Sequence, residues 1–313
     1  MAGGAHRLVA SCVVSQPTKF IRMNFDPTSL IAEEGLDASY ASIVRNWWLP
    51  LAEAIARRRG DERTGRGLVV GINGAQGSGK STLCRFLQAI LHTEFGLSTA
   101  TLSLDDLYLP LSERNHLGQT IHPLLATRGP PGTHDISLGL VTIEGAVAGR
   151  GTLLLPRFDK SRDDRCARSD WEPIDAPVDI LLFEGWMVAA RPQSCKALIR
   201  PVNVLEAEDD VEGVWRRYAN ISLGTDYPAL FGKIDFLVAL IAPSFERVRE
   251  WRLLQEHKLR KRTGGGMSDT EVARFMQFYE RLTRQMLTEI PQRANVSVKL
   301  DLSHNPVRIC LGP

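Results

Sequence analysis

The chain changes character near residue 68, where short apolar runs begin to alternate with longer amphipathic stretches. Short apolar runs are typical of buried strands, and apolar residues that recur every three or four positions are typical of helices. The predicted strands cover residues 68–72, 99–104, 152–155, 178–183, 202–205, 236–241 and 296–300. The predicted helices cover residues 81–92, 135–148, 243–262 and 269–289. Ser268 and Glu271 are spaced as a capping box for the last helix. Together these elements favour a three-layer α/β/α fold, in which helices cover both faces of a mostly parallel sheet.

The first part of the chain follows a different pattern. Within residues 29–59, apolar residues recur mostly at helical spacing. Pro50 has no backbone N–H, so we expect it to break or kink this helix. The predicted organisation is an N-terminal helical extension at residues 1–66 and an α/β domain at residues 67–313.

A glycine-rich loop with the pattern Gly-x-x-x-x-Gly-Lys-Ser directly follows the first predicted strand. Glycines let successive backbone N–H groups converge on phosphate oxygens, and the next helix adds its positive N-terminal end. We predict that Lys80 contacts the β- and γ-phosphates of ATP and that the Ser81 hydroxyl binds Mg²⁺. A merely flexible turn is the alternative, and the strand before the loop and the helix after it argue against one. The predicted ATP-binding residues are Gly74, Ala75, Gln76, Gly77, Ser78, Gly79, Lys80, Ser81 and Thr82.

Loops of this kind occur in GTPases, in ATP-driven motors and in small-molecule kinases, so the loop alone does not decide the function. No Asn-Lys-x-Asp segment for guanine recognition follows the loop, which argues against a GTPase. No repeat or polymer-tracking feature indicates a motor. A small-molecule kinase remains the favoured class.

Two predicted strands end in acidic residues. Asp105 and Asp106 follow the strand at 99–104, and Glu184 follows the strand at 178–183. Carboxylates at the ends of buried strands are costly unless a cation or hydrogen-bond donors lie nearby. We therefore predict that Asp105 lies in the Mg²⁺ shell and accepts the proton of an attacking hydroxyl, and that Glu184 helps to hold Mg²⁺. The alternatives are a helix cap for Asp106 and a surface position for Glu184.

Composition and charge change this picture little. The net charge of +2 gives no overall bias towards nucleic acid or a membrane surface. Five scattered cysteines, including Cys12, suit reduced thiols better than a disulfide framework or a zinc site. The apolar stretch at residues 8–14 is too short for a signal peptide, and no run approaches the roughly 20 residues that span a bilayer. We expect a cytoplasmic protein.

The combination of a P-loop, an Asp-x-x-Tyr sequence and a strand ending in Glu-Gly resembles the uridine kinase, pantothenate kinase and phosphoribulokinase group. The resemblance is closer still to the D-glycerate 3-kinase family. The matching segments are residues 103–108, 127–135, 156–161, 183–187, 251–256 and 279–284. The first 66 residues match no part of the family pattern.

This resemblance implies transfer of the γ-phosphoryl group of ATP to D-glycerate, which gives 3-phosphoglycerate. A small hydroxy acid calls for a fork-shaped cation at its carboxylate and polar groups at its hydroxyls. The predicted substrate-binding residues are Asp105, Tyr108, Arg128, His134 and Asp135. The alternative for the segment at 127–135 is a Gly-Pro turn before a helix that is capped by Thr133 or Asp135.

Arg157 and Lys160 follow a predicted strand, and we expect one of them to contact the γ-phosphoryl group or the substrate carboxylate. The alternative is a solvated basic loop. The predicted catalytic residues are Lys80, Asp105, Glu184, Arg157 and Lys160, and the predicted metal ligands are Ser81, Asp105 and Glu184.

Two alternative functions stay open. The acceptor could instead be a nucleoside, pantothenate or a sugar phosphate. A regulatory protein that binds ATP without turnover is the other alternative, and the intact lysine and carboxylates argue against it. No feature of the sequence indicates an oligomeric state.

Overall fold

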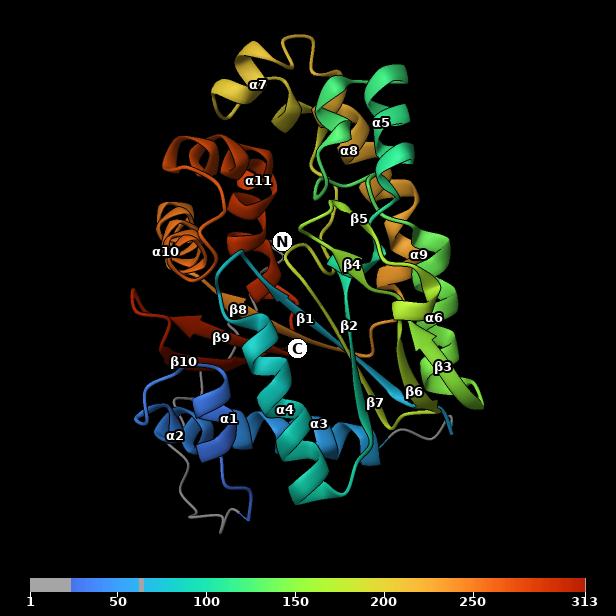
Figure 1. Cartoon of the computed structure of the whole chain (residues 1–313), viewed down its shortest axis with the longest axis vertical. Helices are drawn as coiled ribbons and strands as arrows, with labels where there is room; N and C mark the ends of the chain where they lie inside the picture. The colour runs from blue at the N-terminus through green and yellow to red at the C-terminus, as the bar shows by residue number, and fades with distance from the viewer. Residues whose placement is uncertain (1–23, 62–64, 313) are drawn as a thin grey trace, which may run out of the picture.

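The computed structural model describes residues 24–61 and 65–312, and its centre is a six-stranded sheet in the order β10-β9-β8-β1-β7-β2 (Figure 1). The strands are β1 (Leu68–Gly74), β2 (Thr99–Ser103), β7 (Ile180–Gly185), β8 (Phe236–Ile241), β9 (Val296–Leu300) and β10 (Pro306–Leu311). All neighbours pair in parallel except β10, which runs antiparallel to β9. The predicted mostly parallel sheet is confirmed.

Helices cover both faces of this sheet. The helices are α1 (Thr28–Glu33), α2 (Tyr40–Ile43), α3 (Leu49–Gly60), α4 (Lys80–Phe95), α5 (Leu111–Thr120), α6 (Ile136–Ala148), α7 (Val204–Glu208), α8 (Val214–Thr225), α9 (Tyr227–Phe231), α10 (Phe245–Thr263) and α11 (Asp269–Glu289). One hydrophobic core joins α3, α4 and α10 to one face, and a second core joins α6 and the later part of α11 to the other. Alternate residues of β1 enter opposite cores, with Val70 in the first and Val69 in the second. The predicted three layers are therefore present.

A smaller group of elements lies beyond the carboxyl ends of the central strands. Figure 1 shows α5, α7 and α8 there, and a small separate core of Leu124, Leu125, Leu205 and Trp215 holds this group together. Two short antiparallel pairs complete the fold, β3 (Gly151–Leu155) with β6 (Glu172–Ala176) and β4 (Phe158–Asp159) with β5 (Asp164–Arg165).

The strand predicted at residues 202–205 is wrong, because this segment enters helix α7. Asn203 caps that helix by accepting a hydrogen bond from the backbone N–H of Glu206. Val202 and Val204 are exposed, so the apolar run does not mark a buried strand. The strand predicted at 152–155 exists as β3, but it pairs with β6 outside the central sheet.

The first described residues are helical and pack on the α/β core. A π-helical turn at Val44–Trp48 leads without a break into α3, and Pro50 lies in the first turn of α3. Pro50 has no N–H to donate within this continuous helix, and the predicted interruption takes the form of the π-helical turn that precedes it. The first 23 residues, with Cys12 and the stretch at 8–14, and residues 62–64 lie outside the described part. The domain boundary at residue 66 stays a prediction.

Two local predictions about helix ends are confirmed. Ser268 and Glu271 form the capping box of α11, with each side chain accepting a hydrogen bond from the other residue's backbone N–H. The phosphate loop joins β1 to α4, and its Gly79 precedes α4 with a φ of 86°.

Gly77 lies where the phosphate loop meets helix α10. Its φ of 73° is in the left-handed region, and an added Cβ would come within 3.0 Å of the Trp251 Cβ. We expect Gly77→Ala to lower the free energy of unfolding by more than 2 kcal/mol, about 1 from the left-handed backbone and the rest from the contact.

Gly96 provides the matched control, because its φ is 64° and an added Cβ would meet nothing within 4 Å. Gly96→Ala should cost only the backbone strain of about 1 kcal/mol. Urea unfolding of both variants checks this, and equal losses would contradict the close approach at Gly77.

Candidate active site

The parallel register of three strands brings the predicted loops together. Glu184 of β7 lies opposite Ile72 of β1 on one side and opposite Ser103 of β2 on the other. The phosphate loop therefore begins next to Glu184, and Asp105 follows two residues after Ser103. In parallel sheets, ligands bind at this edge, outside the carboxyl ends of the strands.

The phosphate loop carries polar groups that have no partner in the protein. Ser78 Oγ and Gln76 Oε1 are buried without a hydrogen bond. The Lys80 ammonium donates to the carbonyl of Ala75 at 3.2 Å, so the lysine folds back over the loop. Buried polar groups normally have partners: the Ser78 hydroxyl can donate to an oxygen of a phosphate chain, whereas Gln76 Oε1 is an acceptor and needs a hydrogen-bond donor.

Glu184 is 7% exposed and accepts a hydrogen bond from the Ser81 hydroxyl at 3.1 Å. The predicted surface alternative for Glu184 is therefore wrong. No group of three or more His, Cys, Asp or Glu side chains in residues 24–61 and 65–312 could hold a metal ion by itself. The pair of Ser81 and Glu184 fits Mg²⁺ of the kind that phosphates hold, since Mg²⁺ keeps most of its ligands from substrate and water.

Asp105 lies in a 3₁₀ turn (Leu104–Leu107) directly after β2. Its Oδ1 accepts from the Tyr108 hydroxyl at 2.7 Å, and its Oδ2 accepts from the Lys160 ammonium at 2.6 Å. Burial alone would raise the pKa of Asp105, but the charge and hydrogen bond of Lys160, the Tyr108 hydrogen bond and the charge of Lys80 lower it to about 2. Asp105 is therefore ionised. Two predicted site residues, Tyr108 and Lys160, contact it directly, and the charge of a third, Lys80, acts on it.

Asp106 has a different role from its neighbour. It accepts hydrogen bonds from the Phe158 backbone N–H and from Arg157, both at 3.1 Å. Burial raises the pKa of Asp106 to about 6, against the opposing charge of Arg157. Ser103 caps the 3₁₀ turn, so the predicted cap at Asp106 is wrong. Arg157 also pairs with Glu172, which ties β6 to this turn.

The predicted substrate segment at 127–135 contains two charged residues that already have partners. Arg128 forms an ion pair with Asp163 and lies 5.7 Å from the centroid of the Phe158 ring. Asp135 caps α6 by accepting from the Leu138 N–H, and it also pairs with Arg165 at 3.0 Å. The capping alternative for Asp135 is confirmed, and both of its oxygens are occupied.

Aromatic side chains enclose His134, which is 5% exposed. The Tyr108 ring lies 4.7 Å from the imidazole between centroids, and the Tyr227 hydroxyl lies 2.6 Å from Nδ1. Burial lowers the pKa of His134 to about 3, so the imidazole is neutral. His134, Tyr108 and Asp105 thus form a continuous chain of contacts.

The sequence missed three residues that complete this constellation. Asp163 forms an ion pair with Arg128, and the Tyr227 hydroxyl contacts Nδ1 of His134. The Tyr279 hydroxyl donates to the Arg128 carbonyl at 3.2 Å. Asp163 lies within the charged stretch that follows Lys160, which was a usable signal. The two tyrosines belong to distant helices: Tyr279 begins the matching segment at 279–284 without a predicted site role, and no local motif marks Tyr227.

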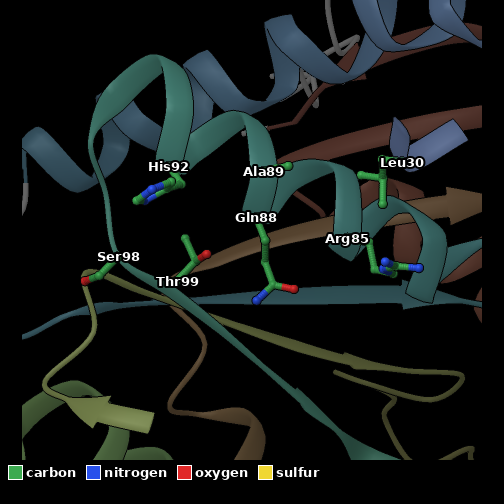
Figure 2. A pocket seen from close by; sticks show the side chains of 7 residues that line it. All are labelled: Leu30, Arg85, Gln88, Ala89, His92, Ser98 and Thr99. Atoms are coloured by element: carbon green, nitrogen blue, oxygen red, sulfur yellow. The ribbon is translucent and has the colours of Figure 1, made fainter. Parts of the chain in front are cut away.

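A separate groove of about 550 Å³ lies between α4 and the start of β2 (Figure 2). It is lined by Leu30, Arg85, Gln88, Ala89, His92, Ser98 and Thr99. These residues include none of the predicted site residues. The candidate active site is therefore placed by the contacts among Asp105, Tyr108, Glu184 and the phosphate loop and not by this groove.

Comparisons with known proteins find similar kinases. No protein-family model matches the chain. The uncharacterized kinase mug58 of Schizosaccharomyces pombe is 37% identical over 224 residues, which cover 69% of this chain and 79% of the relative. The chloroplastic D-glycerate 3-kinase of Arabidopsis thaliana is 31% identical over 77% of this chain, but the match spans only 54% of that enzyme.

Among solved structures, the D-glycerate 3-kinase from Cryptococcus neoformans superposes with a TM-score of 0.69 at 27% identity. The superposition covers 88% of this chain and 99% of that structure. Within the described residues, no helix is long and apolar enough to cross a membrane.

The ion pair at Asp105 makes a prediction about pH. Its folded-state pKa of about 2 lies below the ordinary 3.8, so the ionised carboxylate contributes stability above about pH 4 that is lost as the pH falls towards 2. Lys160→Met removes the main opposing charge, so burial should raise the pKa of Asp105. The variant should be less stable than the parent at about pH 7, and the gap should narrow towards about pH 4.

Urea unfolding at the two pH values measures this gap. Lys233→Met is the matched control, because Lys233 pairs with the exposed Glu144 on the outer side of α6. The control should change stability little at either pH. A gap for Lys160→Met that is independent of pH would show that the ion pair does not set the pKa of Asp105.

Proposed function

Because the chain belongs to the D-glycerate 3-kinase family of P-loop kinases, we propose that it transfers the γ-phosphoryl group of ATP to the 3-hydroxyl of D-glycerate. Family membership makes the chain a small-molecule kinase. The choice of acceptor, the cofactors and the site residues are our proposal, and the contacts described above support it.

The nucleotide occupies the phosphate loop in this proposal. Residues Gly74–Thr82 wrap the phosphates, and the Ser78 hydroxyl, which is buried without a hydrogen bond, would donate to a phosphate oxygen. Lys80 leaves the Ala75 carbonyl for the β- and γ-phosphates. Mg²⁺, held by the Ser81 hydroxyl with Glu184 and Asp105 close by, would neutralise charge on the phosphates.

The observation that carries the choice of acceptor is that Arg128 already holds a carboxylate. Its partner, Asp163, also pairs with the buried Arg114 at 3.1 Å, and its carboxylate has the same charge and shape as that of a small hydroxy acid. A planar guanidinium recognises such a group by two parallel hydrogen bonds. A substrate carboxylate would replace Asp163 as the partner of Arg128. The hydroxyls of the substrate would then face Tyr108 and Asp105.

Asp105 would orient the attacking hydroxyl and receive its proton. The hydroxyl oxygen bonds to the γ-phosphorus, the bond from that phosphorus to the β,γ-bridging oxygen breaks, and ADP leaves with the electron pair. Phosphoryl transfer proceeds through a loose transition state, so the proton moves late and a strongly basic acceptor is not required. Lys160, which contacts Asp105, would then stabilise charge on the transferring group.

A panel of acceptors tests the proposal. The protein is given radiolabelled ATP with D-glycerate, a nucleoside, pantothenate or a sugar phosphate, and the labelled product is separated and counted. Preference for D-glycerate supports the proposal. Preference for a nucleoside or pantothenate would overturn the acceptor while keeping the kinase, and binding of ATP without any turnover would favour a regulatory protein.

Asp105→Asn should lower kcat by a factor on the order of 10² to 10⁴, because the amide cannot accept the proton. The affinity for MgATP should change little, since the phosphate loop is untouched. Steady-state kinetics and ATP titration measure the two effects. Asp159→Asn on β4 is the matched control and should keep full turnover; full turnover of Asp105→Asn would remove Asp105 as the proton acceptor.

Arg128→Ala should raise the KM for D-glycerate by about 10- to 100-fold, the size of a lost charged hydrogen-bond pair of roughly 1.5–3 kcal/mol. The KM for ATP should stay within about twofold. Arg162 is exposed and lies between β4 and β5. Arg162→Ala is the control and should leave both KM values unchanged. A loss confined to ATP affinity would move Arg128 from the substrate site to the nucleotide site.

A further inference from the structure

Nε2 of His134 is a buried polar atom without a hydrogen-bond partner. The imidazole is 95% buried, with 5% exposure, and its other nitrogen, Nδ1, lies 2.6 Å from the Tyr227 hydroxyl. A buried polar group without a partner costs free energy, so an orphan next to a proposed active site points to a ligand.

The hydrogen bonds of Tyr227 decide which nitrogen of His134 carries the proton. The Gly132 backbone N–H donates to the Tyr227 oxygen at 3.0 Å, so that oxygen is already an acceptor. Burial raises the pKa of Tyr227, which therefore keeps its own proton. The remaining contact of the hydroxyl is with Nδ1 of His134. Tyr227 satisfies both groups by donating to Nδ1, and the neutral imidazole must then carry its hydrogen on Nε2.

We propose that Tyr227 is a positioning residue that fixes His134 in the Nε2-protonated neutral form, so that His134 offers one N–H donor to an oxygen of the substrate. This inference deepens the proposed function and rests on it for the identity of the substrate. The chemical class that fits a neutral donor beside the Arg128 cation is a small hydroxy acid, which carries acceptor oxygens at both points.

His134 lies beside the residues that we propose for the substrate site. The charge of Asp105 acts on the imidazole, and the Tyr108 ring that packs on it at 4.7 Å donates its own hydroxyl to Asp105. Nε2 is enclosed in this conformation. Phe158, at the base of the β4–β5 hairpin, packs edge-on against Tyr108 at 5.1 Å and belongs to the same aromatic cluster.

The tautomer itself can be measured without any substrate. Long-range proton–nitrogen NMR correlations of protein labelled with ¹⁵N-histidine distinguish the two neutral forms of each imidazole, and His134→Gln assigns the signal. We expect His134 to be neutral and protonated on Nε2 at about pH 7. A proton on Nδ1 would overturn the inference whatever the substrate proves to be.

Tyr227→Phe removes the donor to Nδ1 and leaves the ring. We expect the His134 signals to show a mixture of tautomers, and the KM for D-glycerate to rise roughly 3- to 10-fold with the KM for ATP unchanged. Thermal unfolding confirms that the variant is folded. An unchanged tautomer and an unchanged KM in the folded variant would overturn the positioning role.

Tyr218→Phe is the matched control, because the Tyr218 ring also packs against Gly132 and its hydroxyl takes part in no described hydrogen bond. It should leave the tautomer and both KM values unaltered. If D-glycerate is not phosphorylated at all, the proposed function fails, whereas the NMR result on the tautomer still decides the inference about Tyr227 and His134.

Discussion

The constraint on which the site depends is the parallel register of β2, β7 and β1. This register sets Glu184 level with Ser103 on one neighbour and with Ile72 on the other. The carboxyl ends of three strands therefore reach the same edge, and each one continues into a different functional segment. The phosphate loop follows β1, the turn with Asp105 follows β2, and Glu184 ends β7. A shift of two residues in the β1–β7 pairing would separate the Ser81 hydroxyl from Glu184, and the same shift in the β2–β7 pairing would move Asp105 away from Glu184.

Charge balance is the second requirement, since this edge collects carboxylates that repel one another. The β4–β5 hairpin supplies the compensation: Lys160 pairs with Asp105, and Asp163 pairs with Arg128. Pairs of this kind offset the cost of desolvation and contribute little net stability. Asp105 and Arg128, with which the hairpin pairs, are the residues that we propose for catalysis and for substrate binding. In the proposed function, nucleotide and acceptor would take over these contacts of the hairpin with Asp105 and Arg128.

How much of this the sequence could predict depends on how far apart the interacting residues lie in the chain. The phosphate loop, the capping box of Ser268 and Glu271 and the strand ending in Glu184 are local patterns, and each was predicted. The run at 202–205 was mistaken for a strand because its valines are apolar, whereas the cap at Asn203 and the exposure of those valines define a helix. The partnership of Tyr227 with His134 spans 93 positions, so only the folded chain shows it.

The central claim is that this arrangement transfers a phosphoryl group to one particular hydroxyl of a small hydroxy acid. Phosphorus NMR of the product formed from ATP and D-glycerate tests it most directly, because the coupling between phosphorus and the carbon-bound protons identifies the esterified oxygen. The account predicts a phosphorus signal split by the two protons of carbon 3, together with that of ADP. A signal split by the single proton of carbon 2, or no ester from D-glycerate while another acceptor is phosphorylated, would contradict it.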